Sequence, residues 1–256
     1  MTVKIGTCGW SAKGGRSRYF QTFNVVELQS TFYQLPRPET ADRWRSQAPE
    51  GFEFTVKAWQ AVTHPPSSPT WRRCRFKPPR DSWDKYGFLR PTEENFNAWE
   101  QTLDICRRLQ AKICVFQTPS SFRYSEENAG NVEAFFTSIH RDGLRLGWEP
   151  RGTWHEHPEE VRRLCESLDL IHVVDPLRRP PSTAGDILYF RLHGLGGREV
   201  NYRYRYTDDD LRRLAGIVKS LGGESRDVYV MFNNVFMFED ALRFKETAAR
   251  LGLEVA

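Results

Sequence analysis

The sequence lacks long apolar runs and the short motifs that mark several large enzyme classes. No uninterrupted apolar stretch approaches the roughly 18 residues of a membrane span. The chain runs directly from its first residues into an expected strand, which leaves no room for a signal peptide. A serine nucleophile elbow, a Walker loop, a G-x-G-x-x-G sequence and an H-E-x-x-H sequence are all missing. These absences argue against a membrane protein and against the enzyme classes that those motifs define.

Cysteine is scarce and irregularly placed. The five cysteines are odd in number and include no C-x-x-C pair. Such spacing does not favour a cysteine-ligated zinc or iron–sulfur site. We therefore expect free thiols and a cytoplasmic location. The residues are Cys8, Cys74, Cys106, Cys114 and Cys165.

Eight short apolar runs recur along the chain, with amphipathic helical stretches between most of them. This alternation predicts the α/β class and a (β/α)₈ TIM-like barrel, for which about 250 residues is typical. We expect one domain over residues 1–256. The strands are expected at 3–7, 25–29, 52–57, 113–117, 146–149, 171–175, 187–193 and 228–233. Helices are expected at 14–23, 39–47, 93–109, 126–140, 158–167, 208–221 and 239–251.

Two connections depart from the repeating unit. Residues 58–91 follow the third strand, are rich in Pro, Trp, Arg and Ser, and show no periodic segment. Loops of this length are commonly lids or binding loops, so we expect an insertion over the catalytic face or one that only packs on the barrel. After the sixth strand, the proline-rich residues 175–181 cannot form a regular helix, and we expect that unit to be degraded to a loop.

Polar residues stand near the ends of nearly all the expected strands, at positions where the alternation of side chains along a strand points them into the barrel. In TIM barrels the carboxyl ends of the strands carry the active site, so we expect these side chains to meet in one pocket. A satisfied ionic network that only closes the barrel is the alternative. The set is Glu27, Gln29, Lys57, Gln117, Glu149, Asp175, Arg191, His193 and Asn233.

Each type of side chain in this set suggests a role. The carboxylates of Glu27, Glu149 and Asp175 could hold one divalent metal ion, or could serve as acid–base groups. His193 suits proton transfer, since its charge changes near neutral pH. Lys57 and Arg191 suit an anionic group of a substrate. The remaining candidates for substrate binding are Trp10, Gln29, His64, Gln117, Arg151 and Asn233.

The net charge of +4 is unevenly distributed. The loops expected on the catalytic face are rich in arginine and lysine, and aromatic residues alternate with these charges. Such loops suit phosphate contacts and base stacking, so an anionic small molecule or a nucleic acid, single-stranded included, is the expected partner. Packed aromatics with solvated arginines between them are the alternative. The basic residues include Arg72, Arg73, Arg75, Lys77, Arg178, Arg179, Arg198, Arg203 and Arg205.

Ordered motifs along the whole chain carry a family resemblance. They include 6–10 (GTCGW), 26–33 (VELQSTFY), 56–58 (VKA), 117–119 (QTP), 148–151 (WEPR), 191–194 (RLHG) and 232–234 (FNN). The chain resembles the domain-of-unknown-function-72 family, also called YecE-like. The resemblance implies a TIM-like barrel similar in architecture to endonuclease IV and sugar isomerases. Cys8 and Gln29 stand where the family usually has Ser and Asn.

Three hypotheses for function follow from these features. The first is an enzyme that acts on a phosphate-bearing or nucleic-acid substrate, of the phosphoester hydrolase or nuclease type. The second is a barrel that binds nucleic acid or nucleotides without catalysis. The third is a sugar or sugar-phosphate isomerase or hydrolase, in which Trp10, Trp59 and Trp154 would be stacking platforms.

Overall fold

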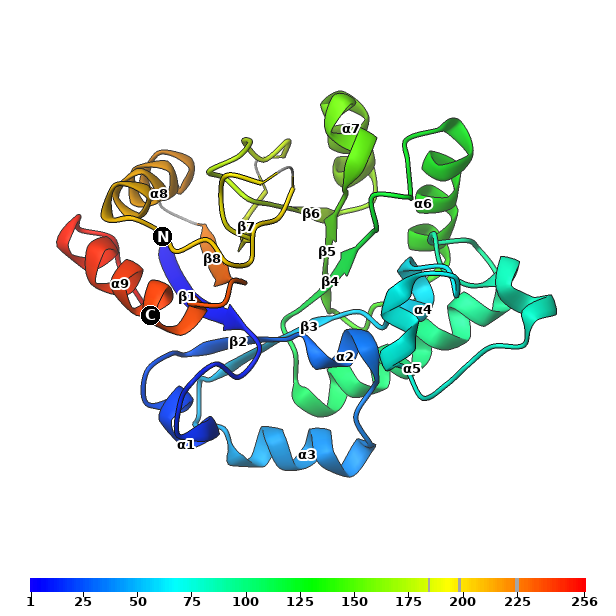
Figure 1. The fold of residues 1–256 in the computed structure, drawn as a ribbon, viewed down its shortest axis with the longest axis horizontal. Coiled ribbons are helices and arrows are strands. Elements are labelled where there is room, and N and C mark those ends of the chain that lie inside the picture. Colours follow the sequence, from blue (N-terminus) through cyan, green and yellow to red (C-terminus); the bar gives the residue numbers. More distant parts are fainter. Residues whose placement is uncertain (184, 198, 224–225) are drawn as a thin grey trace. The chain divides into compact units, whose positions relative to one another are not determined.

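The computed structural model describes residues 1–183, 185–197, 199–223 and 226–256. Its eight parallel strands follow one another in sequence order around a closed barrel, which confirms the predicted fold (Figure 1). The strands are β1 (Thr2–Cys8), β2 (Val25–Leu28), β3 (Glu53–Lys57), β4 (Ile113–Gln117), β5 (Arg145–Glu149), β6 (Leu170–Val174), β7 (Ile187–Leu192) and β8 (Asp227–Phe232).

The longer helices begin where side chains cap them. Thr92 accepts a hydrogen bond from the backbone N–H of Asn95, and Thr207 forms a reciprocal capping box with Asp210. The helices are α1 (Gly15–Phe20), α2 (Ser30–Tyr33), α3 (Pro38–Gln47), α4 (Gln60–Thr63), α5 (Glu93–Leu109), α6 (Glu126–Ser138), α7 (Pro158–Ser167), α8 (Asp208–Leu221) and α9 (Met237–Arg250). The predicted bounds of α5, α7 and α8 are confirmed.

The described chain divides into two compact units. Unit 1 comprises Met1–Glu27, Pro49–Glu53 and Ile171–Ala256, and unit 2 comprises Leu28–Ala48 and Phe54–Leu170. Strands β2, β3 and β6 each begin in one unit and end in the other. The organisation as one domain over residues 1–256 stays a prediction.

In unit 1, β1 pairs with β8 and β8 pairs with β7, all in parallel. Helix α9 packs on β1 and β8, and α8 lies beside α9 (Figure 1). At the amino ends of these strands, Lys4 forms ion pairs of 2.9 Å with Glu53 and with Asp227. Glu53 is the first residue of β3, so this cluster lies away from the carboxyl ends of the strands.

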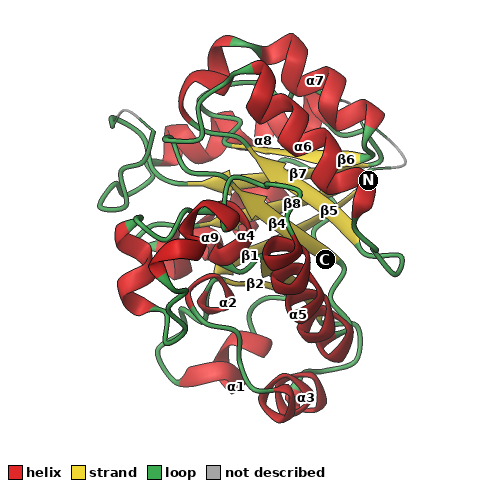
Figure 2. Cartoon of the chain, turned by 90° about the vertical axis from the view of Figure 1, so that its right-hand side faces the viewer, coloured by secondary structure: helices red, strands yellow, loops and turns green. Residues whose placement is uncertain are grey.

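In unit 2, β4 pairs in parallel with β3 and with β5. Helix α5 packs against α3 and α4, and Figure 2 shows α6 beside α7. Buried aromatic rings fill the space behind β4, where Phe116 lies 5.2 Å from Trp99 and 5.0 Å from Phe136, centroid to centroid. These contacts explain the large aromatic residue at position 116 of β4.

The insertion after β3 has more structure than its sequence predicted. Besides α4 it contains two 3₁₀ helices, Pro69–Arg73 and Arg80–Lys85. The backbone of Gly87 donates to Ala61 at 2.7 Å, and Asn95 holds Gly87 through two side-chain bonds. The expectation of a structureless segment was wrong because turns this short carry no 3.6-residue period.

The connection after β6 has the form that the prolines predicted. Between Asp175 and Asp186 the described residues form turns and bends but no helix. Arg198, one of the predicted basic loop residues, lies outside the described residues.

All five cysteines are buried and free. Across the described parts of the chain, no helix is long and apolar enough to cross a membrane.

Candidate active site

A fully buried ion pair lies at the carboxyl end of β2 in unit 1. Arg191 Nη2 donates to Glu27 Oε1 at 2.8 Å, and both side chains have zero exposed surface. The hydroxyl of Tyr189 donates to the other carboxylate oxygen at 3.0 Å. Tyr189 and Arg191 stand two residues apart on β7 and therefore share its inward face. The two oxygens of Glu27 are thus held by protein groups from one strand.

The imidazole of His193 is oriented by Asn233. The amide nitrogen of Asn233 lies 3.1 Å from Nδ1 of His193, and both side chains are buried. Since an amide nitrogen only donates, Nδ1 accepts and the proton of the neutral ring sits on Nε2. The backbone supports this geometry, because the N–H of Asn233 donates to Leu192 at 2.9 Å. His193 therefore presents an N–H at its second ring nitrogen.

Asp175 combines deep burial with incomplete hydrogen bonding. One carboxylate oxygen accepts from the N–H of Leu177 at 3.0 Å, whereas Oδ2 has no hydrogen-bond partner among the described residues. Nε of Arg178 lies 3.6 Å from Oδ2, close enough for an ion pair but too far for a hydrogen bond. Burial raises the pKa of Asp175 to about 6, against the opposing effects of the Leu177 N–H and the Arg178 charge. The group is mostly ionised at pH 7 but binds a proton more readily than an ordinary aspartate.

The loop after β7 is fixed to its surroundings. The Arg178 guanidinium donates to the carbonyls of Gly194 and Gly197, and the N–H of Gly194 donates to the hydroxyl of Tyr206 at 2.7 Å. Gly194 has a φ of 81°, and a Cβ there would lie 2.1 Å from the carbonyl oxygen of Asn201. Only glycine fits this position, which explains the glycine that ends the RLHG motif at 191–194.

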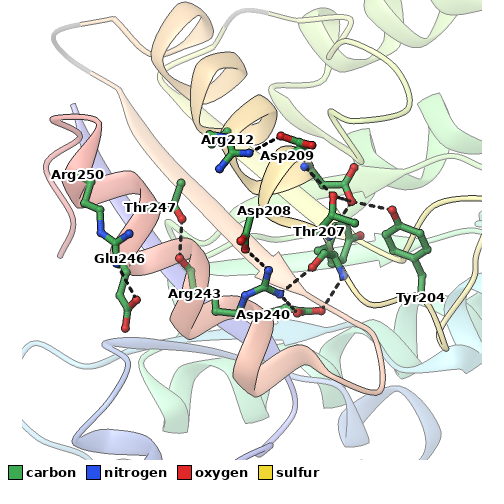
Figure 3. Close-up of polar contacts among 12 residues, drawn as sticks. Tyr204, Thr207, Asp208, Asp209, Arg212, Asp240, Arg243, Glu246, Thr247 and Arg250 are labelled. Atoms are coloured by element: carbon green, nitrogen blue, oxygen red, sulfur yellow. Dashed lines mark hydrogen bonds and ion pairs between the residues drawn. The ribbon is translucent and has the colours of Figure 1, made fainter.

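Asp240 anchors the next part of that loop (Figure 3). Its carboxylate accepts from Asn234 at 2.7 Å, from the N–H of Tyr206 at 3.3 Å and from Arg243 at 3.1 Å. Asn234 also donates to the carbonyl of Tyr204 at 2.8 Å. This network connects the start of α9 to the loop that carries Tyr202, whose ring lies 6.1 Å edge-on from His193.

Unit 2 holds a second group of predicted site residues around Lys57. The ammonium of Lys57 donates to Oε1 of Gln117 at 2.8 Å and lies 3.9 Å from the ring centroid of Phe32. Lys57 and Gln117 are both buried, at the carboxyl ends of β3 and β4. The aromatic face and the amide oxygen stabilise the charged form of a lysine at a buried position.

His64 lies in a positive electrostatic environment. Burial lowers the pKa of His64 well below its usual range, and the charges of Lys57 and Arg151 lower it further. Its Nδ1 is 2.8 Å from the hydroxyl of Thr63. A neutral imidazole beside two cations marks this part of unit 2 as suited to an anionic group.

Glu149 and Arg151 form an ion pair at the end of β5. Nε and Nη2 of Arg151 both approach Oε1 of Glu149, at 3.1 and 2.8 Å. Glu149 is buried and the Arg151 side chain is 14% exposed. The arginine therefore connects a buried carboxylate to the surface.

The other two candidates occupy more peripheral positions. The indole of Trp10 packs edge-on against Tyr19 at 5.2 Å and against Phe20 at 5.5 Å in unit 1. Gln29 is half-buried and precedes α2 in unit 2. Trp154, considered as a stacking platform, is fully buried and packs on Trp148, so it has no face to offer a ligand.

The predicted residues thus lie in two sets, one within each unit. Glu27, Asp175, Arg191, His193 and Asn233 belong to unit 1, and Lys57, His64, Gln117, Glu149 and Arg151 belong to unit 2. Their meeting in one pocket stays a prediction. Within the part of the chain that the structure describes, no three His, Cys, Asp or Glu side chains group as metal ligands would. The role of Glu27, Glu149 and Asp175 as joint ligands of a metal ion stays a prediction.

Several residues of the site were not predicted from the sequence. Arg178 was predicted only as a basic loop residue, although it follows Asp175 by three positions. Tyr189 stands two residues before Arg191 and therefore points to the same side of the strand. This spacing would have identified Tyr189 as a partner of Glu27. Tyr206 and Asp240 had no such signal, because their contacts join segments far apart in the sequence.

The fold and these strand-end side chains define a parallel barrel of the TIM class. The family model described as "Protein of unknown function DUF72" matches residues 4–255, so the chain belongs to this family. It is 26% identical to UPF0759 protein YunF of Bacillus subtilis, over 91% of this chain and 88% of that protein. A DUF72 family protein of Thermotoga maritima superposes with a TM-score of 0.73 at 26% identity, over 97% of this chain and all of that one (100%).

More distant barrels share only the fold. A D-tagatose 3-epimerase-like protein has a TM-score of 0.55 at 14% identity, over 98% of this chain and 96% of the other. Endonuclease IV of Thermus thermophilus has a TM-score of 0.53 at 13% identity, over 97% and 98% of the two chains. The expected architectural similarity to both kinds of barrel is confirmed at this level.

Proposed function

We propose that this protein is an enzyme that hydrolyses a phosphoester, with Asp175 as the general base and the neutral imidazole of His193 as the hydrogen-bond donor to the leaving oxygen. Its substrate is an anionic small molecule or a nucleic acid. The proposal rests first on Asp175, a buried carboxylate with one oxygen that lacks a hydrogen-bond partner among the described residues. Burial that raises a carboxylate pKa toward neutrality is a recurrent property of catalytic bases.

The chemical step uses groups of unit 1. Asp175 accepts a proton from a water molecule as the water oxygen attacks phosphorus. The bond from phosphorus to the leaving oxygen breaks, and Nε2–H of the neutral His193 donates a hydrogen bond that stabilises the negative charge developing on that oxygen. Asn233 keeps Nδ1 of His193 as the acceptor, which leaves the donating N–H on Nε2. A solvent proton then neutralises the leaving oxygen, and Asp175 returns to solvent the proton that it took from the attacking water.

The position of Arg178 supports the choice of an anionic substrate. Arg178 lies beside Asp175 in unit 1 and is held by two loop carbonyls, so its charge has a fixed position. A preorganised cation stabilises the charge that develops on phosphoryl oxygens in the transition state.

Glu27 and Arg191 have a different role in this proposal from the one the sequence suggested. Their side chains are fully buried and bound to one another. We assign them to positioning, since β7 carries Arg191 and leads directly to His193. In unit 2, Glu149 orients Arg151.

The test is hydrolysis of bis(p-nitrophenyl) phosphate, p-nitrophenyl phosphate and a 5′-labelled single-stranded oligonucleotide. The wild-type protein is compared with Asp175→Asn and His193→Ala, each checked for folding by circular dichroism. The proposal expects hydrolysis of at least one substrate and a loss of about 10²–10⁴-fold in each variant. Equal rates in wild type and both variants would contradict it. Binding of the oligonucleotide without hydrolysis would instead favour the non-catalytic barrel.

A further inference from the structure

A cavity lies within unit 2, between the insertion after β3 and one face of α5. It has a volume of about 280 Å³, near the lower end of the range for small-molecule sites. Figure 1 shows the insertion, in cyan, beside α5, and the Arg80–Lys85 3₁₀ helix contacts that helix. The lining residues are Gln34, Leu35, Trp59, Phe76, Tyr86, Glu94, Asn97, Ala98 and Gln101. We propose that this cavity binds an uncharged carbohydrate of one or two sugar rings.

One wall of the cavity is a regular polar stripe on α5. Glu94, Asn97, Ala98 and Gln101 recur at the spacing that places residues on the same helix face. Ala98 is buried and leaves room between the longer side chains, whereas Asn97 and Gln101 are exposed. The side-chain amide of the exposed Asn97 carries donors and an acceptor that suit sugar hydroxyls.

The opposite wall consists of aromatic rings that meet at an angle. Phe76 lies 5.8 Å from Trp59 with the ring planes at 58°, and 5.9 Å from Tyr86 with the planes at 57°. Rings so inclined offer apolar faces to the C–H groups of a puckered ring. Phe76 is 40% exposed, so part of its ring is accessible to a ligand.

The charge of the lining argues against a nucleotide. None of the nine lining residues is basic, and Glu94 is acidic. A hydrogen bond from Lys85 lowers the pKa of Glu94, so this carboxylate is ionised at neutral pH. None of the lining residues supplies a cation to replace the hydration of a phosphate group, and the charge of Lys85 beside the cavity is already paired with Glu94 at 3.0 Å. Sugar hydroxyls can donate to the same carboxylate.

One buried donor in the lining also lacks a partner. The indole N–H of Trp59 is buried and makes no hydrogen bond to any described residue. A buried donor of this kind costs stability of the free protein. A ligand hydroxyl that reaches this N–H after a small shift of the indole would satisfy it.

The experiment is saturation-transfer NMR on the whole protein with a pooled panel of neutral sugars. The panel contains D-glucose, D-galactose, D-mannose, D-xylose, cellobiose, maltose and lactose, with adenosine and uridine as competing probes. Phe76→Ala is the test variant, and Gln101→Ala is a second variant on the other wall. Trp83→Ala is the matched control, because Trp83 lies in the same insertion, is 38% exposed and does not line the cavity.

We expect at least one sugar to bind, with affinity about tenfold weaker in Phe76→Ala and unchanged in Trp83→Ala. Binding should also be unchanged in Asp175→Asn, since this inference does not rest on the proposed hydrolysis. The proposal is overturned if no sugar binds, if only adenosine or uridine binds, or if Phe76→Ala and Gln101→Ala both bind sugar like the wild type.

Discussion

Arg191 and Glu27 form an ion pair of 2.8 Å in which neither side chain has any exposed surface. Burying two charges costs solvation, and the cost is offset only while both partners are present. The additional bond from Tyr189 to Glu27 completes the arrangement at the end of β2. The pair is therefore a structural prerequisite for the neighbouring groups, His193 included.

Replacing Arg191 by Met should destabilise the fold by about 3–5 kcal/mol, because it leaves the Glu27 carboxylate buried without its cation. The double variant Glu27→Gln with Arg191→Met should recover a large part of this loss. Urea denaturation measures both values. Glu246→Gln is the control, since it breaks an exposed pair with Arg250 and should change stability by less than about 1 kcal/mol. A double variant no more stable than Arg191→Met alone would contradict the account.

The raised pKa of Asp175 predicts a specific pH dependence of stability. Its pKa is 3.8 in the unfolded chain and about 6 in the folded protein. Between these values the folded state binds more protons, so the free energy of unfolding falls as pH rises from about 4 to 6. The full contribution is about 3 kcal/mol. Asp175→Asn should remove this decline, and denaturation at pH 4, 5, 6 and 7 measures it. If the free energy of unfolding falls with pH as steeply in Asp175→Asn as in the wild type, burial of Asp175 is not the cause of the decline.

The hydrogen bond between Asn233 and His193 predicts one imidazole tautomer. In the wild type, ¹⁵N NMR at a pH where the ring is neutral should show the proton on Nε2. In Asn233→Asp the new carboxylate accepts from Nδ1–H, and the proton should move to Nδ1. A wild-type spectrum with the proton on Nδ1 would refute the assigned roles.

His64 should titrate well below an ordinary histidine. Burial and the charges of Lys57 and Arg151 all oppose its protonation. Removing one charge in Lys57→Met should raise the pKa of His64, and NMR titration of the imidazole measures the shift. Lys112→Met, which alters an exposed lysine of the same unit, should leave that pKa unchanged. If Lys57→Met lowered the pKa or left it in place, the electrostatic explanation would fail.

The sequence predicted the barrel well because each element carries a local signal. The capping threonines at 92 and 207 precede amphipathic helices, and the strands are apolar runs bounded by turn residues. Parity along the strands also predicted correctly that Glu27, Lys57 and Arg191 are buried. These features depend on periods of two and 3.6 residues, which a single sequence displays.

Features that depend on non-local contacts could not be predicted from the sequence. Nothing near Asp240 indicates that its carboxylate binds the backbone of Tyr206, 34 positions away. The insertion is held by bonds such as Trp71 to the carbonyl of His64, which leave no periodic pattern. The pairing of Glu27 with Arg191 required the register of distant strands. In the proposed function it changes the role of Glu27 from an acid–base or metal-binding group to a positioning residue, and the role of Arg191 from substrate contact to positioning.

The most direct test of the proposed chemistry is the pH dependence of kcat/KM for phosphoester hydrolysis by the wild-type protein. With Asp175 as the base, the rate should rise with pH and level off above an inflection near 6, the value to which burial raises its pKa. In Asp175→Asn this inflection should be absent from the residual activity. A rate that falls through pH 6, or an inflection that persists in Asp175→Asn, would contradict the assignment of Asp175 as the catalytic base.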